Sequence, residues 1–298
     1  MAAHMSSAVA DDGDNTPIQV LIALYPGFDR LDLDGPLKVL NTALHDPKDK
    51  TSQAFDVTFV SAEDQEEVKP DKGEPIKSQT SFKDAHKDLE NYHLLVIVGG
   101  PSVTKILDKE QEPLGLINDF AELQKRDPAT ERTLFSVGTG SLLLARENIL
   151  SGLSATTHPD YITKFENECS DAATRHLTER TDVIEDARYV VNNLRFDLDE
   201  GDESPYIRRK SDSGRRPSNA RKGSMSFKNS NSRRESIVRR AAMRLGGLRV
   251  ITAGPENSGT DAALYLVSAL VDDGCAAEVA RTMQWTWNKG VVVDGLDV

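Results

Sequence analysis

The segment 134–145 constrains the fold of this chain more than any other. Residues 134–137 are an apolar run, 138–141 form a corner of small residues, and 142–145 are apolar again. This pattern predicts a buried strand that turns sharply into a helix. Such a turn directs its corner residue and the free N–H groups of the helix at one point, as in a nucleophile elbow. The corner residue here is Gly138, which has no side chain with which to attack a substrate.

Other apolar runs predict further buried strands, and helical patterns lie between them. Strands that alternate with helices indicate an α/β fold, a mostly parallel sheet with helices on both faces. The polar stretch 63–81 predicts short edge strands or a surface hairpin. The predicted strands outside the corner are 18–24, 54–62, 94–98, 153–158, 183–185, 189–191 and 248–252, and a main predicted helix is 114–125.

Composition excludes several classes of protein. A formal net charge of −12 argues against a general nucleic-acid binder, and no apolar run is long enough for a membrane span. The two cysteines, Cys169 and Cys275, cannot form a disulfide framework and lack metal-ligand spacing. We therefore expect no metal or cofactor, and a reducing cytoplasmic or nuclear location.

A break in composition divides the chain. Residues 206–240 hold twelve Lys and Arg, two acids and eight serines, too few apolar residues to offset the entropy of ordering. We predict one domain over 17–195 and 247–298, with 196–246 as a disordered basic insertion in a β-hairpin. Residues 1–16 are predicted to be a disordered tail. Within the insertion, Ser211, Ser218 and Ser236 follow paired basic residues, as in the sites of basophilic protein kinases. A solvated linker is the alternative interpretation of the insertion.

Asp32 is the candidate acid or base. Pro36 suits the first turn of a helix to about residue 44, so Asp32 is expected in the preceding loop and Asp34 as the cap. Burial by neighbours such as Leu31 would raise the pKa of Asp32 into the range useful for proton transfer. The alternative is a purely structural, helix-capping aspartate.

Four blocks resemble the ThiJ/PfpI superfamily, within it the isonitrile-hydratase-like branch, whose fold is that of class I glutamine amidotransferases. Their order and spacing carry the resemblance, which implies a flavodoxin-like α/β sandwich and a homodimer. The blocks are Tyr25-Pro26-Gly27-Phe28 with Leu31-Asp32-Leu33-Asp34-Gly35-Pro36, Val98-Gly99-Gly100, Ser136 to Ser141 with Ala155-Thr156-Thr157-His158, and Thr252-Ala253-Gly254 with Gly259-Thr260-Asp261-Ala262-Ala263-Leu264.

The resemblance also implies roles for single residues. The family's corner residue is a cysteine, and that position maps onto Gly138. Its acid maps onto Asp32, and its backbone N–H donors map onto Gly99, Gly100 and Thr139. His158 is a candidate catalytic residue, with a structural role as the alternative. The candidate substrate-binding residues are Tyr25, Phe28, Gly99, Gly100 and Pro101.

Two functions follow as hypotheses. The first is a cofactor-free enzyme of the lyase, isomerase, cyclase or hydratase type, which acts on a small molecule through Asp32 and the N–H groups of Gly100 and Thr139. The second is a catalytically silent binding or regulatory protein. A laboratory replacement of cysteine by Gly138 in a hydratase is a third interpretation of the corner.

Overall fold

The fold is built on a sheet of eight strands. The computed structural model describes residues 16–63, 66–193 and 237–294, and its sheet has the order β12-β10-β11-β7-β6-β1-β2-β5. Neighbouring strands run parallel, except that β10 is antiparallel to β11. The strands are β1 (Ile18–Ala23), β2 (Phe55–Ser61), β5 (Thr80–Ser81), β6 (Leu94–Ile97), β7 (Thr133–Val137), β10 (Tyr189–Asn193), β11 (Arg249–Ala253) and β12 (Val291–Asp294).

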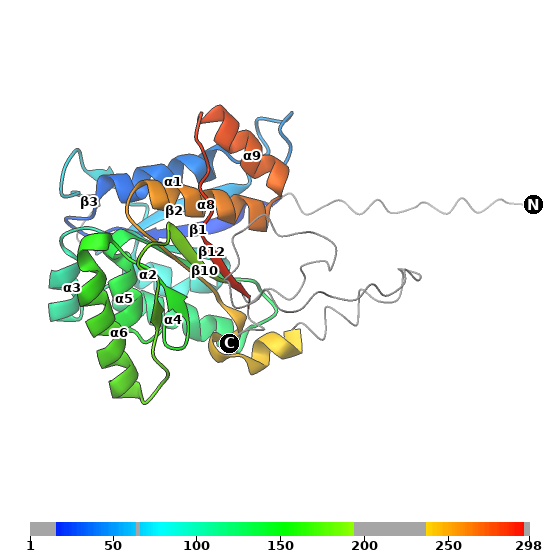
Figure 1. Ribbon diagram of the computed structural model, residues 1–298. Helices are drawn as coiled ribbons and strands as arrows, with labels where there is room; N and C mark the ends of the chain where they lie inside the picture. The colour runs from blue at the N-terminus through cyan, green and yellow to red at the C-terminus, as the bar shows by residue number, and fades with distance from the viewer. Residues whose placement is uncertain (1–15, 64–65, 194–236, 295–298) are drawn as a thin grey trace, which may run out of the picture.

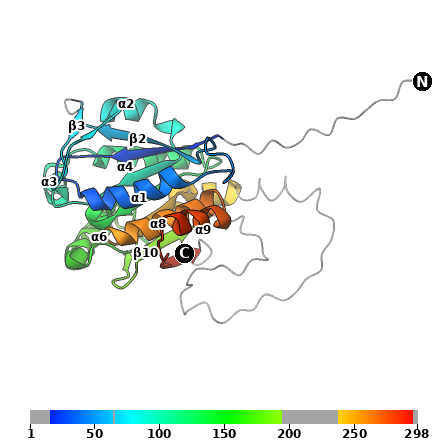
Figure 2. The same ribbon diagram turned by 90° about the horizontal axis from the view of Figure 1, so that it is seen from above.

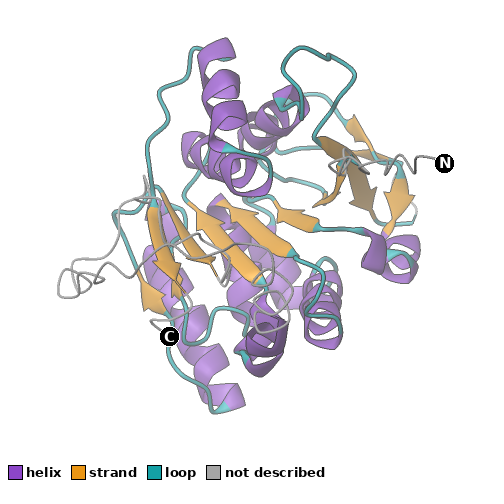
Figure 3. Cartoon of the chain, turned by 90° about the vertical axis from the view of Figure 1, so that its right-hand side faces the viewer, coloured by secondary structure: helices purple, strands orange, loops and turns teal. Residues whose placement is uncertain are grey.

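Helices cover both faces of this sheet (Figures 1 and 3). One layer holds α1, α8 and α9, which lie nearest the viewer in Figure 2, and the other holds α2 to α6. The central strands are buried on both faces because helices cover them twice. The helices are α1 (Arg30–Thr42), α8 (Asn257–Leu270), α9 (Asp273–Thr282), α2 (Phe82–Lys87), α3 (Val103–Lys109), α4 (Leu114–Arg126), α5 (Ser141–Arg146) and α6 (Ile162–His176).

The structure confirms the predicted α/β fold with a mostly parallel sheet. The predicted hairpin in 63–81 is also present, as antiparallel β3 (Glu67–Val68) and β4 (Ile76–Lys77). A second small sheet pairs β8 (Ser154–Ala155) with β9 (Asp182–Val183) in parallel. Among the helices that the structure describes, none combines the length and the apolar character that crossing a membrane requires.

The start of α1 differs from the prediction. The helix begins at Arg30, because the Asp29 side chain accepts a hydrogen bond from the Leu31 N–H (2.8 Å) and caps it earlier than Asp34 could. Asp32 therefore lies in the first helical turn and not in a loop, and Pro36 lies inside the helix. The predicted capping role of Asp34 is wrong, since its carboxylate pairs with Arg30 (2.7 Å).

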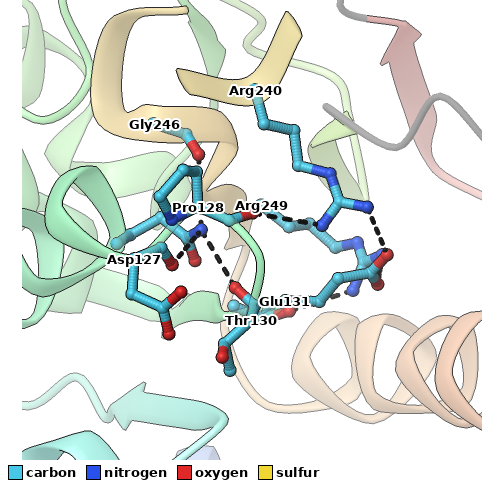
Figure 4. Close-up of polar contacts among 9 residues, drawn as sticks. Asp127, Pro128, Thr130, Glu131, Arg240, Gly246 and Arg249 are labelled. Atoms are coloured by element: carbon cyan, nitrogen blue, oxygen red, sulfur yellow. Dashed lines mark hydrogen bonds and ion pairs between the residues drawn. The ribbon is translucent and has the colours of Figure 1, made fainter. Parts of the chain in front are cut away.

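The last residues of the predicted insertion 196–246 have defined structure. Residues 237–242 form a helix and η5 (Arg244–Gly247) a 3-10 turn, although we placed both in the disordered segment. They are ordered because Arg240 is buried and its guanidinium reaches Glu131 (3.1 Å, Figure 4), which also pairs with Arg249 (3.7 Å). Residues 1–15 and 194–236, with Ser211, Ser218 and Ser236, lie outside the described residues.

Helix α8 packs against its neighbours through glycine. A Cβ atom on Gly259 would lie 2.7 Å from Cγ1 of Val137 in β7 and 3.3 Å from Cγ of Pro36 in α1. The backbone of α8 therefore lies directly on β7, at the end of the strand where the corner begins. This contact sets the height of α8 above the sheet.

We predict that Gly259→Ala destabilises the protein by about 2 kcal/mol, because overpacking against β7 outweighs the better helix propensity of alanine. Urea unfolding would measure this free energy. The matched control is Gly115→Ala on the exposed side of α4, where the new Cβ meets only the Glu112 side chain. A Gly259→Ala variant as stable as the control would contradict the close packing.

Candidate functional site

The candidate site lies where four neighbouring strands end. Asp32 follows β1, Gly99 follows β6, Gly138 follows β7 and Glu256 follows β11, and these strands are adjacent in the order β11-β7-β6-β1. The carboxyl ends of parallel strands are the usual place for ligand sites in α/β sheets. The fold thus brings together residues that are up to 224 positions apart in the sequence.

The Asp32 carboxylate is the buried polar group at the centre of the site. Its residue is only 3% exposed, and Oδ1 accepts a hydrogen bond from the Glu256 N–H at 2.6 Å. Burial, together with the smaller effect of the nearby charges of Asp29 and Glu256, raises the pKa of Asp32 to about 7. Hydrogen bonds from the N–H groups of Glu256 and Gly99 oppose this shift. Asp32 is therefore partly protonated at neutral pH.

Two glycines leave the space that this carboxylate occupies. A Cβ atom on Gly138 would overlap Oδ2 of Asp32 and lie 3.2 Å from its Cγ. A Cβ atom on Gly99 would lie 2.5 Å from the same Oδ2 and 2.7 Å from the Thr139 nitrogen. Real Cβ atoms do not approach other atoms so closely, so any side chain at either position would displace Asp32.

Gly138 forms the predicted corner between β7 and η2 (Gly138–Gly140), which leads into α5. Its φ of +56° is in the left-handed region that favours glycine. The Gly138 carbonyl accepts hydrogen bonds from the hydroxyls of Ser141 and Thr157, each at 3.2 Å. The Ser141 hydroxyl is thus engaged with the corner backbone.

The predicted N–H donors have partners within the site. The Gly100 N–H donates to Oγ1 of Thr139 (2.9 Å), and this hydroxyl donates to the Gly100 carbonyl (3.1 Å). Gly100 could therefore bind an oxyanion only if the Thr139 side chain rotated away. The Thr139 N–H lies in the first turn of η2, where N–H groups have no intrahelical partner.

The predicted substrate-binding side chains have different surroundings. Tyr25 is buried and its hydroxyl donates to the Val98 carbonyl (2.6 Å), and burial together with the Asp32 charge raises its pKa well above the ordinary value. Phe28 is fully buried in the core, whereas Pro101 is exposed. Leu31, expected to cover Asp32, is instead 57% exposed.

His158 has a local role in the structure. Its Nδ1 accepts a hydrogen bond from the Asp160 N–H (3.1 Å) and its ring meets Tyr161 edge-on, with centroids 5.5 Å apart. It caps the 3-10 turn η3 (Pro159–Tyr161). These contacts favour the structural interpretation of this histidine. No group of three or more His, Cys, Asp or Glu residues placed to hold a metal ion occurs in the described part of the chain.

Sequence reasoning missed three contributors to the site. Glu256 acts through its backbone, and no sequence signal links it to Asp32. Asp29 acts through its charge and could have been found as an alternative helix cap. Thr157 holds the corner carbonyl, and its place in a polar pair at a strand end was a signal.

Comparisons with known proteins identify the family and the fold. A model of the DJ-1/PfpI family matches residues 18–193, more than half of the chain. The chain belongs to the DJ-1/PfpI family. A search of curated proteins finds no match.

Solved structures of similar fold include other members of the family. A ThiJ/PfpI family protein from Pseudomonas syringae aligns with a TM-score of 0.56 at 17% identity, covering 96% of this chain and 84% of the other. DJ-1beta from Drosophila melanogaster aligns with a TM-score of 0.56 at 15% identity, covering 91% and 100%. An AraC family transcriptional regulator from Pseudomonas putida aligns with a TM-score of 0.54 at 18% identity, covering 90% and 100%. At these identities the likeness concerns the fold alone.

We predict that Asp32→Asn changes how stability depends on pH. Between about pH 4 and pH 7 the folded protein keeps a proton on Asp32 that the unfolded chain has lost, so the free energy of unfolding falls as pH rises through this window. Asparagine does not titrate, so the free energy of unfolding of the variant rises relative to that of the wild type by up to about 4 kcal/mol between pH 4 and pH 8. Denaturant unfolding across this range measures the difference. The exposed Asp34→Asn is the control, and parallel curves for Asp32→Asn and wild type would contradict the raised pKa.

We predict that Gly138→Ala destabilises the protein by about 3 kcal/mol, because alanine is strained at this φ and overlaps Asp32. In an Asp32→Ala background the overlap disappears and the cost falls. A double-mutant cycle measured by unfolding separates the two parts. Gly152→Ala, at a φ of +70° but facing only the end of the Glu179 side chain, gives the cost of backbone strain alone. Equal costs of Gly138→Ala in both backgrounds would show that Asp32 does not occupy this space.

Proposed function

We propose that this chain is an acid–base enzyme of the lyase, isomerase, cyclase or hydratase type, with Asp32 as the group that transfers the proton to and from a small molecule. The observation that carries the proposal is the buried Asp32 carboxyl, which lies beside the glycine corner and has a pKa of about 7. A general acid or base is most effective when its pKa lies near the working pH. The isonitrile-hydratase-like branch and the correspondence of Gly138 to the family's nucleophile position are part of this proposal.

The chemistry follows from the groups at the corner. Ionised Asp32 can take a proton from a substrate atom near Oδ2, and the protonated carboxyl can return it at a second atom. Negative charge that develops on the substrate would be stabilised by the Thr139 N–H at the start of η2. Gly138 offers no side chain for a covalent intermediate, so the corner serves as the floor of the site.

The silent binding protein is the competing hypothesis. It keeps the same corner and the same buried carboxylate, but Asp32 would then only be held in place by Glu256 and Gly99. The two hypotheses differ in whether the proton of Asp32 moves during turnover.

We expect Asp32→Asn to lower turnover at least 100-fold while the protein stays folded, because asparagine cannot exchange the proton. The measurement is mass spectrometry of a metabolite extract incubated with wild type, Asp32→Asn or the control Asp34→Asn. Compounds that wild type and the control convert should persist with Asp32→Asn. Conversion of the same compounds by Asp32→Asn would refute the role of Asp32, and no conversion by any of the three would favour the silent binding protein.

A further inference from the structure

The loop 254–256, between β11 and α8, touches both central residues of the site. The Gly254 carbonyl accepts a hydrogen bond from the Gly138 N–H at 3.3 Å. Two residues later, the Glu256 N–H donates to Oδ1 of Asp32 at 2.6 Å. The position of this loop therefore determines the surroundings of the corner and of the carboxylate together.

Glu256 adopts a strained backbone conformation to make its contact. Its φ is +47° and its ψ is −100°, a combination that residues with a Cβ atom rarely adopt. Its side chain is exposed, so packing of that side chain does not explain the strain. Strained residues persist only where their surroundings fix them. Some other contact must hold the loop in place.

Arg188 binds the two sides of this loop. At the first residue of the loop, the Arg188 carbonyl accepts a hydrogen bond from the Gly254 N–H at 3.0 Å. After the loop, the guanidinium donates through Nε (2.9 Å) and Nη2 (2.6 Å) to Oδ2 of Asp261 in α8. Arg188 thus joins the end of β11 to the second turn of α8 and spans the strained residue.

The partner of Arg188 is itself firmly held. Asp261 is fully buried, and its Oδ1 accepts hydrogen bonds from Trp285 Nε1 (2.8 Å) and from the Asn288 N–H (3.1 Å). Oδ1 is therefore occupied by these two donors, and Oδ2 is left to accept the two N–H groups that the forked guanidinium of Arg188 provides. This arrangement resists movement of α8 relative to β11.

We propose that Arg188 is a positioning residue of the site, which keeps the strained Glu256 peptide directed at Asp32 through its ion pair with Asp261 and its carbonyl bond to Gly254. The inference deepens the proposed function, because it names what sets the proton affinity of Asp32. The groups that face Asp32 are Asp29, Glu256 and Tyr25. Of its neighbours, only the N–H donors Glu256 and Gly99 favour the ionised form.

The test measures the pKa of Asp32 from the ¹³C chemical shift of its carboxyl group as a function of pH. The signal is assigned by its absence in Asp32→Asn. Arg188→Lys keeps the charge opposite buried Asp261 but loses the fork. We expect this variant to let the Glu256 backbone relax, so that Asp32 loses one hydrogen bond to its charged form. The pKa of Asp32 should then rise by about one pH unit. Because this readout needs no substrate, its outcome is independent of whether Asp32 performs catalysis.

Two double variants separate positioning from general loosening. In Arg188→Lys with Glu256→Gly, glycine adopts the unusual φ without strain, so we expect the pKa to return to that of Glu256→Gly alone. In Arg188→Lys with Glu256→Ala, the strain remains and the rise should persist relative to Glu256→Ala alone. Both backgrounds lack the Glu256 charge, so they differ only in the backbone.

Arg240→Lys is the control, since Arg240 also pairs with a carboxylate, that of Glu131 (Figure 4). Glu131 precedes β7, at the end of the strands away from Asp32. This control should leave the pKa of Asp32 unchanged. An unchanged pKa in folded Arg188→Lys would overturn the proposal, as would a rise that persists in the glycine background or one that appears equally in Arg240→Lys. If Arg188→Lys alone does not fold, the comparison of each double variant with Glu256→Gly or Glu256→Ala alone decides.

Discussion

The site depends on a carboxylate held where the backbone leaves no room for a side chain. Oδ2 of Asp32 lies between the backbones of Gly99 and Gly138, and Oδ1 receives the N–H of Glu256. The protein thus removes a carboxyl group from water and gives it two backbone donors, while the charged groups that act on it, Asp29 and Glu256, are both acidic. Burial prevails over these donors, and the group retains its proton near neutrality.

The parallel sheet makes this arrangement feasible. The segments after β1, β6, β7 and β11 meet because the four strands are adjacent and point the same way. Close packing by glycine then brings the layers near enough for contact, as where α8 rests on Val137. Each segment contributes one backbone or side-chain group, so the site is assembled from tertiary structure more than from any single motif.

Much of the fold could be predicted from sequence, because buried parallel strands are continuous apolar runs and 94–98 and 134–137 have no other reasonable interpretation. The corner at Gly138 and the central position of Asp32 were also within reach. The boundary of α1 was not, since Asp29 and Asp34 are the same residue type, one that commonly caps helices, and only the structure shows that Asp29 accepts the Leu31 N–H. Glu256 was beyond prediction because it acts through an N–H that every residue except proline possesses. The defined structure of residues 237–247 depends on the pairing of Arg240 with the distant Glu131, which composition does not reveal.

The antiparallel pairing of β10 with β11 has a consequence for how this domain can change in length. Asn192 lies opposite Val250, at the end of the sheet away from Asp32, while Tyr189 lies opposite Ala253 beside the site. The described chain therefore leaves β10 at Asn193, at the end of the sheet remote from the site, and residues 237–247 are docked at that same end through the pairing of Arg240 with Glu131. Changes in length between residues 193 and 237 would thus fall far from the four segments that surround the buried carboxylate. The architecture leaves one end of the sheet open to variation in sequence and keeps the other fixed around Asp32.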